Sequence, residues 1–391
     1  MDVTEAKDRV RAEIERLTPR LLEISHSIHA NPELNFEEHH AHDLLSGTLE
    51  DEGIPVARGA YDMATAFDAR VGSSGPTIAV CCEYDALPGI GHACGHNIIA
   101  AAGLGAGVGA ATVAEALGAT VAILGTPAEE GGGGKEYMIR RGAFDDVDVA
   151  MMIHPADRDL QTMHTIAIQS LDVEYDGRAA HAAAAPEQGL NALDAAVLGY
   201  NNVAALRQHI QPEERIHGIF TEAGDKPNIV PSRAAAEWYV RSGTVSSLEP
   251  LKDRVMACLQ GGADAAGCSM HAEWHDPTFF DMIDNHPLLE AFVKNSTDIG
   301  RHPVPEEEGR MVVGSTDMGN VSYAVPSIHP MIKCAPEGTA IHTADFAVHA
   351  RSEAGDRAVV DGALSMALTM VDCMANAQTL AAIRDDFESR A

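Results

Sequence analysis

Three apolar stretches in the first half of the chain have the length and composition of buried strands. They cover residues 77–84, 119–125 and 147–153, and helical patterns separate them. Strands that alternate with helices predict a mainly parallel central sheet with helices on both faces. In open α/β sheets, ligands bind outside the carboxyl ends of the strands. We therefore expect the residues that follow these stretches to meet at one edge of the sheet.

The middle of the chain has a different order of elements. The pattern predicts strand, helix, strand, strand, helix and strand, over residues 167–175, 190–209, 216–222, 233–241, 247–260 and 268–275. This is the ferredoxin-like order, and a compact unit of this kind can be inserted into a larger domain. We therefore expect a catalytic, metal-binding α/β domain in two parts, residues 1–166 and 280–391. Between them, residues 167–279 form an inserted α+β ferredoxin-like lid, whose exposed strand edges suit dimerisation.

The small, apolar stretch at residues 98–117 predicts a helix, with Asn97 as a suitable N-cap. Glycines between residues 103 and 111 imitate a dinucleotide-binding fingerprint. They lie inside the predicted helix and their spacing fits the fingerprint poorly, so a nicotinamide enzyme is the weaker interpretation. Helical patterns also cover residues 5–27, 38–52, 287–300 and, as the last clear helix, 356–378.

Composition narrows the class of protein. A chain of 391 residues with 46% hydrophobic residues is expected to form two domains around a sizeable core. The formal net charge of −31 argues against a nucleic-acid partner, which requires a basic surface. Uninterrupted apolar runs of about 18 residues do not occur, so no membrane span is expected. The charged N-terminal helix pattern differs from a secretion signal, so we expect a cytoplasmic protein.

The seven cysteines lack the spacing of a disulfide framework, and only Cys94 has histidines on both sides of it. Cys94 and His96 cannot share one helix face, because positions i and i+2 diverge. On a loop in which Gly95 allows a tight bend, both side chains can point at one ion. A thiolate and an imidazole are typical zinc ligands. The alternative is a buried core thiol followed by a histidine that starts a helix.

Two adjacent carboxylates, Glu129 and Glu130, follow the second apolar stretch. On an extended segment they would point to opposite sides, so one could bind a metal ion while the other acts as a general base. Asp85 follows the first stretch, and a carboxylate there can orient a metal-bound histidine. His154 ends the third stretch. The simpler alternatives are a solvated acidic pair, a turn residue and a core histidine.

These segments resemble the dinuclear metal aminoacylase and carboxypeptidase superfamily of amidohydrolases. Within it they are most similar to the auxin-conjugate hydrolase branch, and there to the aminobenzoyl-glutamate hydrolase and β-alanyl-lysine dipeptidase group. The matching pieces run in order over nearly the whole chain, at residues 29–34, 37–38, 83–89, 91–97, 126–131, 152–155, 177–182, 189–194 and 314–319.

The resemblance implies roles for individual residues. The metal ligands that it implies are Cys94, His96, Glu130, His154 and His342. It implies that Glu129 is the general base and that Asp85 supports the metal site. His181, from the inserted domain, would stabilise the oxyanion, in several relatives from the partner subunit. Asn228 and Arg241 fall where relatives bind the substrate carboxylate.

Three positions depart from the pattern or depend on it alone. Many auxin-conjugate hydrolases have Asp where this chain has Asn97, and other branches have a ligand histidine where it has Glu83. We therefore do not count Glu83 as a ligand. The residues alone do not favour His342 over other histidines nearby in the sequence, so its selection rests on the resemblance.

The expected function is metal-dependent hydrolysis of an amide bond in N-acyl amino acids, dipeptides or aminobenzoyl-glutamate-like substrates. The resemblance implies two divalent ions per subunit, with Zn²⁺ preferred and Mn²⁺ or Co²⁺ as alternatives. It also implies a homodimer or a higher homo-oligomer. The competing interpretation is a catalytically silent, metal-binding subunit of a hetero-oligomeric hydrolase.

Overall fold

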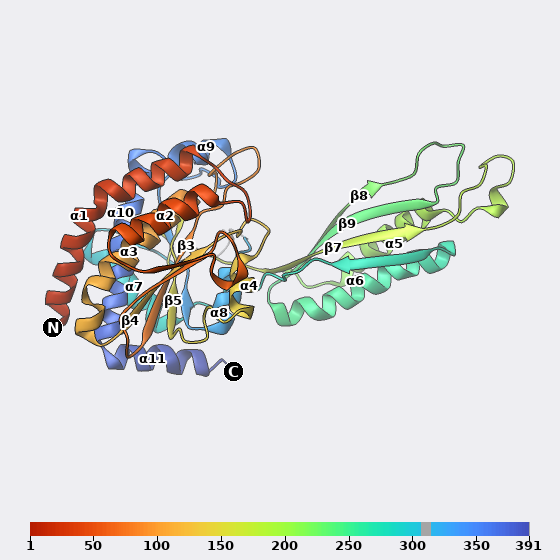
Figure 1. Ribbon diagram of the computed structural model, residues 1–391. Helices are drawn as coiled ribbons and strands as arrows, with labels where there is room; N and C mark the ends of the chain where they lie inside the picture. Colours follow the sequence, from red (N-terminus) through yellow and green to blue (C-terminus); the bar gives the residue numbers. More distant parts are fainter. Residues whose placement is uncertain (306–313, 391) are drawn as a thin grey trace. The chain divides into compact units, whose positions relative to one another are not determined.

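The computed structural model describes residues 1–305 and 314–390. These residues form two compact units (Figure 1). Unit 1 combines Met1–His164 with Met282–Ala391, and unit 2 is Thr165–Asp281.

Unit 1 is a three-layer α/β structure. Its elements are α1 (Val3–Ala30), α2 (His39–Asp51), β1 (Val56–Arg58), β2 (Phe67–Val71), β3 (Thr77–Glu83), α3 (His96–Leu117), β4 (Thr120–Thr126), α4 (Gly134–Arg140), β5 (Val149–Met151), β6 (His154–Ala156), α7 (His286–Asp298), α8 (Met318–Ala324), β11 (Ser327–Ile328), β12 (Met331–Lys333), α9 (Ala344–His349), α10 (Glu353–Ala375) and α11 (Ala377–Glu388). The central sheet has the order β1-β2-β4-β3-β5-β11. Strands β4, β3, β5 and β11 are parallel, while β1 and β2 are antiparallel additions at one edge.

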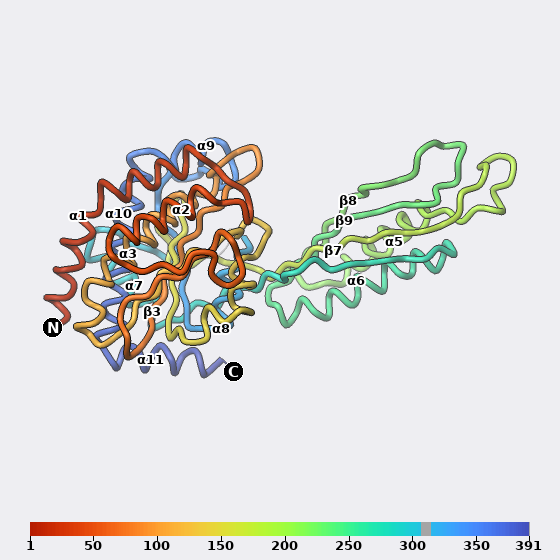
Figure 2. Tube along the Cα trace, in the orientation of Figure 1, coloured from red at the N-terminus to blue at the C-terminus, as the bar shows by residue number. Residues whose placement is uncertain are grey.

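The central strand β3 is buried on both faces, which is why it reads as a continuous apolar run. Ile78 and Val80 face the larger core, to which α1, α3 and α10 contribute. Ala79 and Cys81 face a second core, which includes residues of α4 and α8. Figure 2 shows α1 running beside α3 and α10. The predicted fold, a mainly parallel sheet between helices, is confirmed.

Glycines in α3 allow this helix to lie very close to the sheet and to α1. A Cβ atom at Gly103 would be 2.8 Å from the carbonyl oxygen of Cys81, and one at Gly107 would be 2.4 Å from Cγ1 of Ile123. At Gly105 it would be 2.6 Å from Cδ1 of Leu21 in α1. The glycine run therefore serves packing, in agreement with its placement inside a helix.

Within residues 1–305 and 314–390, two helices, α3 and α10, are long and apolar enough to cross a membrane by length and composition alone. In α3, 89% of the most apolar stretch is buried within the protein, and in α10 72%. Such burial is typical of core helices in a globular fold, so their hydrophobicity is explained by packing.

Unit 2 has the ferredoxin-like order that the sequence predicts. Its elements are β7 (Ala167–Asp176), α5 (Ala192–Leu206), β8 (Arg215–Glu222), β9 (Arg233–Ser242), α6 (Val245–Ala266) and β10 (Ser269–Trp274). The antiparallel sheet has the order β10-β7-β9-β8. Helices α5 and α6 pack together and against the sheet, around a core that includes Tyr175 and Trp238.

Three local predictions are wrong. Helix α3 begins at His96 with Gly95 as N-cap, and the Asn97 side chain instead donates to Ser25 Oγ and to the carbonyl oxygen of Ala350. The third apolar stretch does not run unbroken to His154, because β5 ends at Met151 and His154 begins the separate strand β6. The chain also continues after α10 into a further helix, α11, whose first turn is capped by Asn376.

Because Gly107 has no room for a larger side chain, Gly107→Val is expected to lower the free energy of unfolding by about 1–3 kcal/mol through overpacking against Ile123. Ala116→Val is the control, since Ala116 is exposed on the same helix. Urea unfolding of both variants measures the difference. Equal stability of the two variants would show that α3 does not depend on this close approach.

Candidate metal centre

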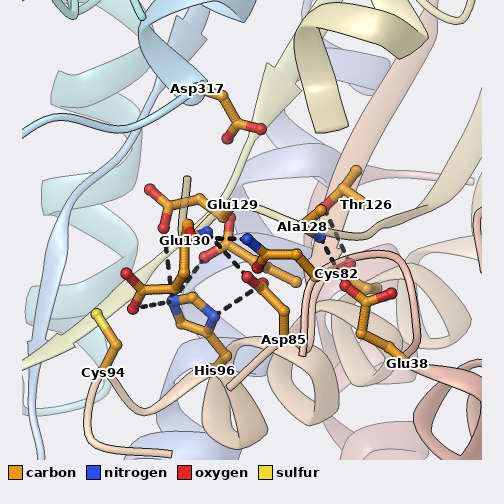
Figure 3. Close-up of polar contacts among 12 residues, drawn as sticks. Glu38, Cys82, Asp85, Cys94, His96, Thr126, Ala128, Glu129, Glu130 and Asp317 are labelled. Carbon is orange, nitrogen blue, oxygen red and sulfur yellow. Dashed lines mark hydrogen bonds and ion pairs between the residues drawn. The ribbon is translucent and has the colours of Figure 1, made fainter. Parts of the chain in front are cut away.

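The carboxyl ends of the central strands meet around His96. Glu83 is the last residue of β3, and the Glu129–Glu130 pair follows β4. Cys94 lies in the loop that leads into α3, where Gly95 has a φ of 81° and so can turn the chain into the helix. In Figure 3, Asp85, Cys94 and Glu130 lie around the His96 ring.

Among the residues that the structure describes, three groups of side chains have ligand atoms close enough to hold a metal ion, with every pair of atoms in a group within 4.8 Å. The groups are Cys94, His96 and His154; Cys94, Glu130 and His342; and Glu83, His96 and Glu129. The first two share Cys94, which is therefore in a position to contact two ions. The five ligands that the resemblance implies all fall within these two groups.

The orientation of His96 leaves one ring nitrogen for a cation. Its Nδ1 lies 3.1 Å from Asp85 Oδ1, and an ionised carboxylate can only accept, so Nδ1–H donates. Its Nε2 faces Glu83 Oε1 at 3.1 Å. Within residues 1–305 and 314–390, neither of these two atoms has a hydrogen-bond partner of good geometry. Two buried acceptor atoms that face each other need a proton or a metal ion between them.

His154 is oriented in the same way. Its Nδ1 lies 2.8 Å from the carbonyl oxygen of Pro155, to which it donates, and its Nε2 is 3.3 Å from Cys94 Sγ. A zinc ion binds sulfur at about 2.3 Å and nitrogen at about 2.0–2.1 Å, so two such ligands of a tetrahedral ion lie about 3.5 Å apart. The donor set, its hydrogen-bonded imidazoles and its spacing therefore fit a metal ion.

His342 comes from far along the chain, in the loop before α9. Its Nε2 is 3.4 Å from Glu130 Oε1, and its backbone N–H donates to the carbonyl oxygen of Ala93 at 2.9 Å. Its φ of 62° is uncommon for a residue other than glycine. The hydrogen bond to Ala93 holds the loop of His342 against the loop of Cys94. Half of the His342 side chain is exposed, which leaves an open side to the centre.

The two adjacent glutamates lie in a turn, and not on the extended segment that the sequence suggested, because β4 ends at Thr126. Ala128 has a φ of 61°, which turns the chain just before Glu129. Hydrogen bonds fix the turn: the Ala128 N–H donates to Glu38 Oε1 at 2.9 Å, and the Glu130 N–H donates to Asp85 Oδ2 at 2.8 Å. The turn therefore presents Glu129 and Glu130 to the same centre.

Negative charge dominates the site. Burial raises the pKa of Glu129 well above its usual range, and the neighbouring Glu83 adds to this shift. Burial alone would lower the pKa of His96, but Glu83 and Asp85 outweigh it and hold it well above its ordinary value. Burial opposes ionisation of Glu130 as well, yet His342 and His96 keep its pKa low. Such a centre attracts cations.

Sequence reasoning missed four buried residues that surround the centre. Lys135 contacts both Glu83 and Asp317. Glu38 holds the turn before Glu129. His329 packs its ring edge-on to that of His154, with centroids 5.5 Å apart. A lone lysine, aspartate or histidine gives no signal of burial in the sequence, although Glu38 and Asp317 do fall within matching segments.

The three residues expected to contact substrate lie in unit 2. His181 and Asn228 are exposed on neighbouring loops, joined by a hydrogen bond from the Ala182 N–H to the Asn228 carbonyl at 3.0 Å. Arg241 lies on β9, opposite Ile168 of β7. The ring nitrogen Nδ1 of His181 accepts from the N–H groups of Ala183 and Ala184, at 3.2 and 3.1 Å. In the neutral ring, the proton is therefore on Nε2.

Comparisons with known proteins agree with this fold and centre. Residues 80–364 match the model of peptidase family M20/M25/M40. The chain is 38% identical to the human Xaa-Arg dipeptidase, over 96% of this chain and 90% of that protein. It is 27% identical to one of the p-aminobenzoyl-glutamate hydrolase subunits of Escherichia coli, over 93% and 90% of the two chains. A dinuclear metal-binding peptidase from Bacillus subtilis has the same fold, with a TM-score of 0.72 at 18% identity over 92% of this chain and 99% of that one.

An α/β fold that gathers cysteine, histidine and carboxylate side chains beside a buried glutamate is typical of a metal-dependent hydrolase. The family match covers well over half of the chain, and the human relative matches nearly all of it. The chain belongs to peptidase family M20/M25/M40 and is an enzyme that hydrolyses amide bonds.

Titration of Glu38 is expected to make the free energy of unfolding depend on pH. Burial raises the pKa of Glu38 from 4.5 to about 7. Because the folded-state value is the higher one, stabilisation from protonating Glu38 is complete below pH 4.5 and is lost as the pH rises through about 7. The effect is on the order of 3 kcal/mol at most.

We therefore expect the stability of the wild type, relative to the non-titrating variant Glu38→Gln, to fall between pH 4.5 and pH 8. Urea unfolding in the presence of a chelator measures it, and Glu37→Gln, at an exposed neighbour, is the control. A difference between wild type and Glu38→Gln that stays constant with pH would contradict the raised pKa.

Proposed function

We propose that this chain is a dipeptidase that uses two divalent metal ions and prefers dipeptides with a cationic C-terminal residue. The observation that carries the proposal is the 38% identity to the human Xaa-Arg dipeptidase, which extends over 96% of this chain and 90% of that protein. A net charge of −31 supports it, because an acidic protein attracts cationic substrates.

In this proposal, the two overlapping groups of side chains would hold the ions, and Cys94 would be available to both. Cys94, His96 and His154 would hold one ion, and Cys94, Glu130 and His342 would hold the other. Two such ions, when bound, would acidify a water molecule and polarise the substrate carbonyl. The mixture of sulfur, nitrogen and oxygen ligands suits Zn²⁺, with Mn²⁺ and Co²⁺ as alternatives.

Glu129 is the general base of the proposed reaction. It takes a proton from the attacking water and later gives it to the nitrogen of the leaving amino acid. Its burial and the raised pKa support this role, because a base that must also donate needs a pKa nearer neutrality than that of an exposed glutamate. Asp85 orients His96 through the Nδ1 hydrogen bond.

Unit 2 is proposed to act as a lid that supplies the substrate contacts. The N–H on Nε2 of His181 is suited to donate to the oxyanion, because Nδ1 is engaged as an acceptor. Asn228 and Arg241 are proposed to bind the substrate carboxylate. We further propose that the protein is cytoplasmic and forms a homodimer, in which His181 acts from the same protomer or from its partner.

Glu129→Gln is expected to retain both metal ions but to lose at least about 10³-fold in kcat, since the base is removed and the ligands stay. Glu130→Gln is the matched variant, because it changes the adjacent carboxylate, and it is expected to lose bound metal. Mass spectrometry of metal content and chromatography of hydrolysis products measure the two effects. Hydrolysis by Glu129→Gln at the wild-type rate would contradict the assignment of the base.

The substrate preference is tested with a panel of amides and the purified chain alone, with and without a chelator. We expect kcat/KM for Ala-Arg and β-alanyl-lysine to exceed that for Ala-Glu by at least about tenfold, equal to about 1.4 kcal/mol of discrimination. The second candidate is p-aminobenzoyl-glutamate, favoured by the match to the Escherichia coli protein over 93% of this chain and 90% of that one. Preference for that substrate would overturn the first choice, and hydrolysis of none would favour a catalytically silent protein.

A further inference from the structure

Glu83 is a buried carboxylate whose two oxygens face different partners. Its Oε1 is 3.1 Å from Nε2 of His96, and its Oε2 contacts Nζ of Lys135. The side chains of Glu83, His96 and Lys135 have no exposed surface. Oε1 thus points toward the candidate metal centre, while Oε2 is paired with Lys135 on the opposite side.

Lys135 is fixed in the position that holds Glu83. Its Nζ lies 2.7 Å from Asp317 Oδ1, and its backbone N–H donates to Asp317 Oδ2 at 2.9 Å. It belongs to the first turn of α4, directly after Gly134, where a Cβ atom would be 1.9 Å from the carbonyl oxygen of Pro127. Neither Glu83 nor Lys135 can therefore move without disturbing β3, α4 or the loop before α8.

The charges around Glu83 do not balance. The ammonium group of Lys135 pairs with two carboxylates, Glu83 and Asp317. A third carboxylate oxygen, Glu129 Oε2, lies only 4.0 Å from the same Nε2 of His96. A buried charge that lacks compensation is costly. The Nδ1–H of His96 is already given to Asp85, so the facing atoms Nε2 and Glu83 Oε1 are both acceptors when the ring is neutral.

The separation of these two atoms suits ligands of one ion. Nitrogen and carboxylate ligands about 2.0–2.2 Å from one ion lie about 3.0–3.5 Å apart for angles between about 90° and tetrahedral. The observed 3.1 Å lies within this range. The ligand atom of Glu83 lies within 4.8 Å of those of His96 and Glu129, so Glu83 reaches the ion through the His96 side of the centre. We propose that Glu83 is an additional protein ligand of the ion that His96 binds, and that Lys135, anchored by Asp317, is the positioning residue that aims it. This inference rests on the proposed metal centre and adds a sixth ligand to it.

The proposal is tested by metal binding in the full-length enzyme. Glu83→Gln is expected to weaken one of the two Zn²⁺ ions by at least about 100-fold, and Lys135→Met by about 10–100-fold, in competition with a chromogenic chelator. With Co²⁺ in place of Zn²⁺, the visible absorption bands of one ion are expected to shift in both variants. Glu136→Gln is the control, since Glu136 is the acidic neighbour of Lys135 and pairs instead with Arg140 and Asn320.

Glu83→Asp keeps the test valid if Glu83→Gln does not fold. It preserves the buried charge opposite Lys135 but withdraws the carboxylate by one methylene, so one ion is expected to bind more weakly and its Co²⁺ bands to shift. If Glu83→Gln and Glu83→Asp bind both ions with wild-type affinity and spectrum, Glu83 only pairs with Lys135 and the inference is wrong. If the wild type itself binds fewer than two ions, the proposed dinuclear centre fails, which is a separate result.

Discussion

The structure depends on a concentration of buried acceptor atoms at the carboxyl edge of the central sheet. Glu83, Asp85, Glu129 and Glu130 converge there on His96, and Lys135 is a cation held among them. Removing this much negative charge from water is unfavourable unless cations compensate it. In the proposed function, divalent ions held between Cys94, the histidines and the carboxylates would offset this charge, and the same ions would supply the chemistry of amide hydrolysis.

The carboxylates and His96 lie at strand ends, in the short loops that follow, or at the first residue of a helix, so regular secondary structure positions them. The parallel strands β3 and β4 end together, since Glu83 pairs with Thr126, and their following loops start from the same edge. Helix α3 can approach the sheet because its glycines leave room. His96, its first residue, is thereby fixed within reach of both loops. Close packing of α3 against the sheet thus sets the distances between the candidate ligand atoms. Metal binding tolerates errors of only a few tenths of an ångström in such distances.

Much of the fold could be predicted from sequence because its signals are local. The apolar runs of β3 and β4, and the strand–helix order of unit 2, follow from periodicity. Cys94 and His96 are separated by a single glycine and follow Asp85, and further candidate ligands follow the neighbouring strands, so their position in the chain favours a ligand pair. Errors arose where tertiary contacts decide, as at Asn97, whose side chain bonds α1 and the residue after α9 instead of capping its own helix.

The rest of the centre depends on contacts between distant segments. His342 meets Glu130 from a loop near the other end of the chain, and Asp317 meets Lys135 across 182 residues. No periodicity connects such pairs. The left-handed backbone of Ala128, which turns the chain before Glu129, is equally hidden, because alanine does not favour it and the Ala128 N–H donates to the distant Glu38. Only a resemblance to known proteins could indicate His342 in advance.

The central claim is that two cations share Cys94. Anomalous diffraction from crystals of the zinc-loaded protein tests it most directly. The account predicts two peaks, one among Cys94, His96 and His154 and one among Cys94, Glu130 and His342. A single peak remote from Cys94, or none at full zinc loading, would contradict it.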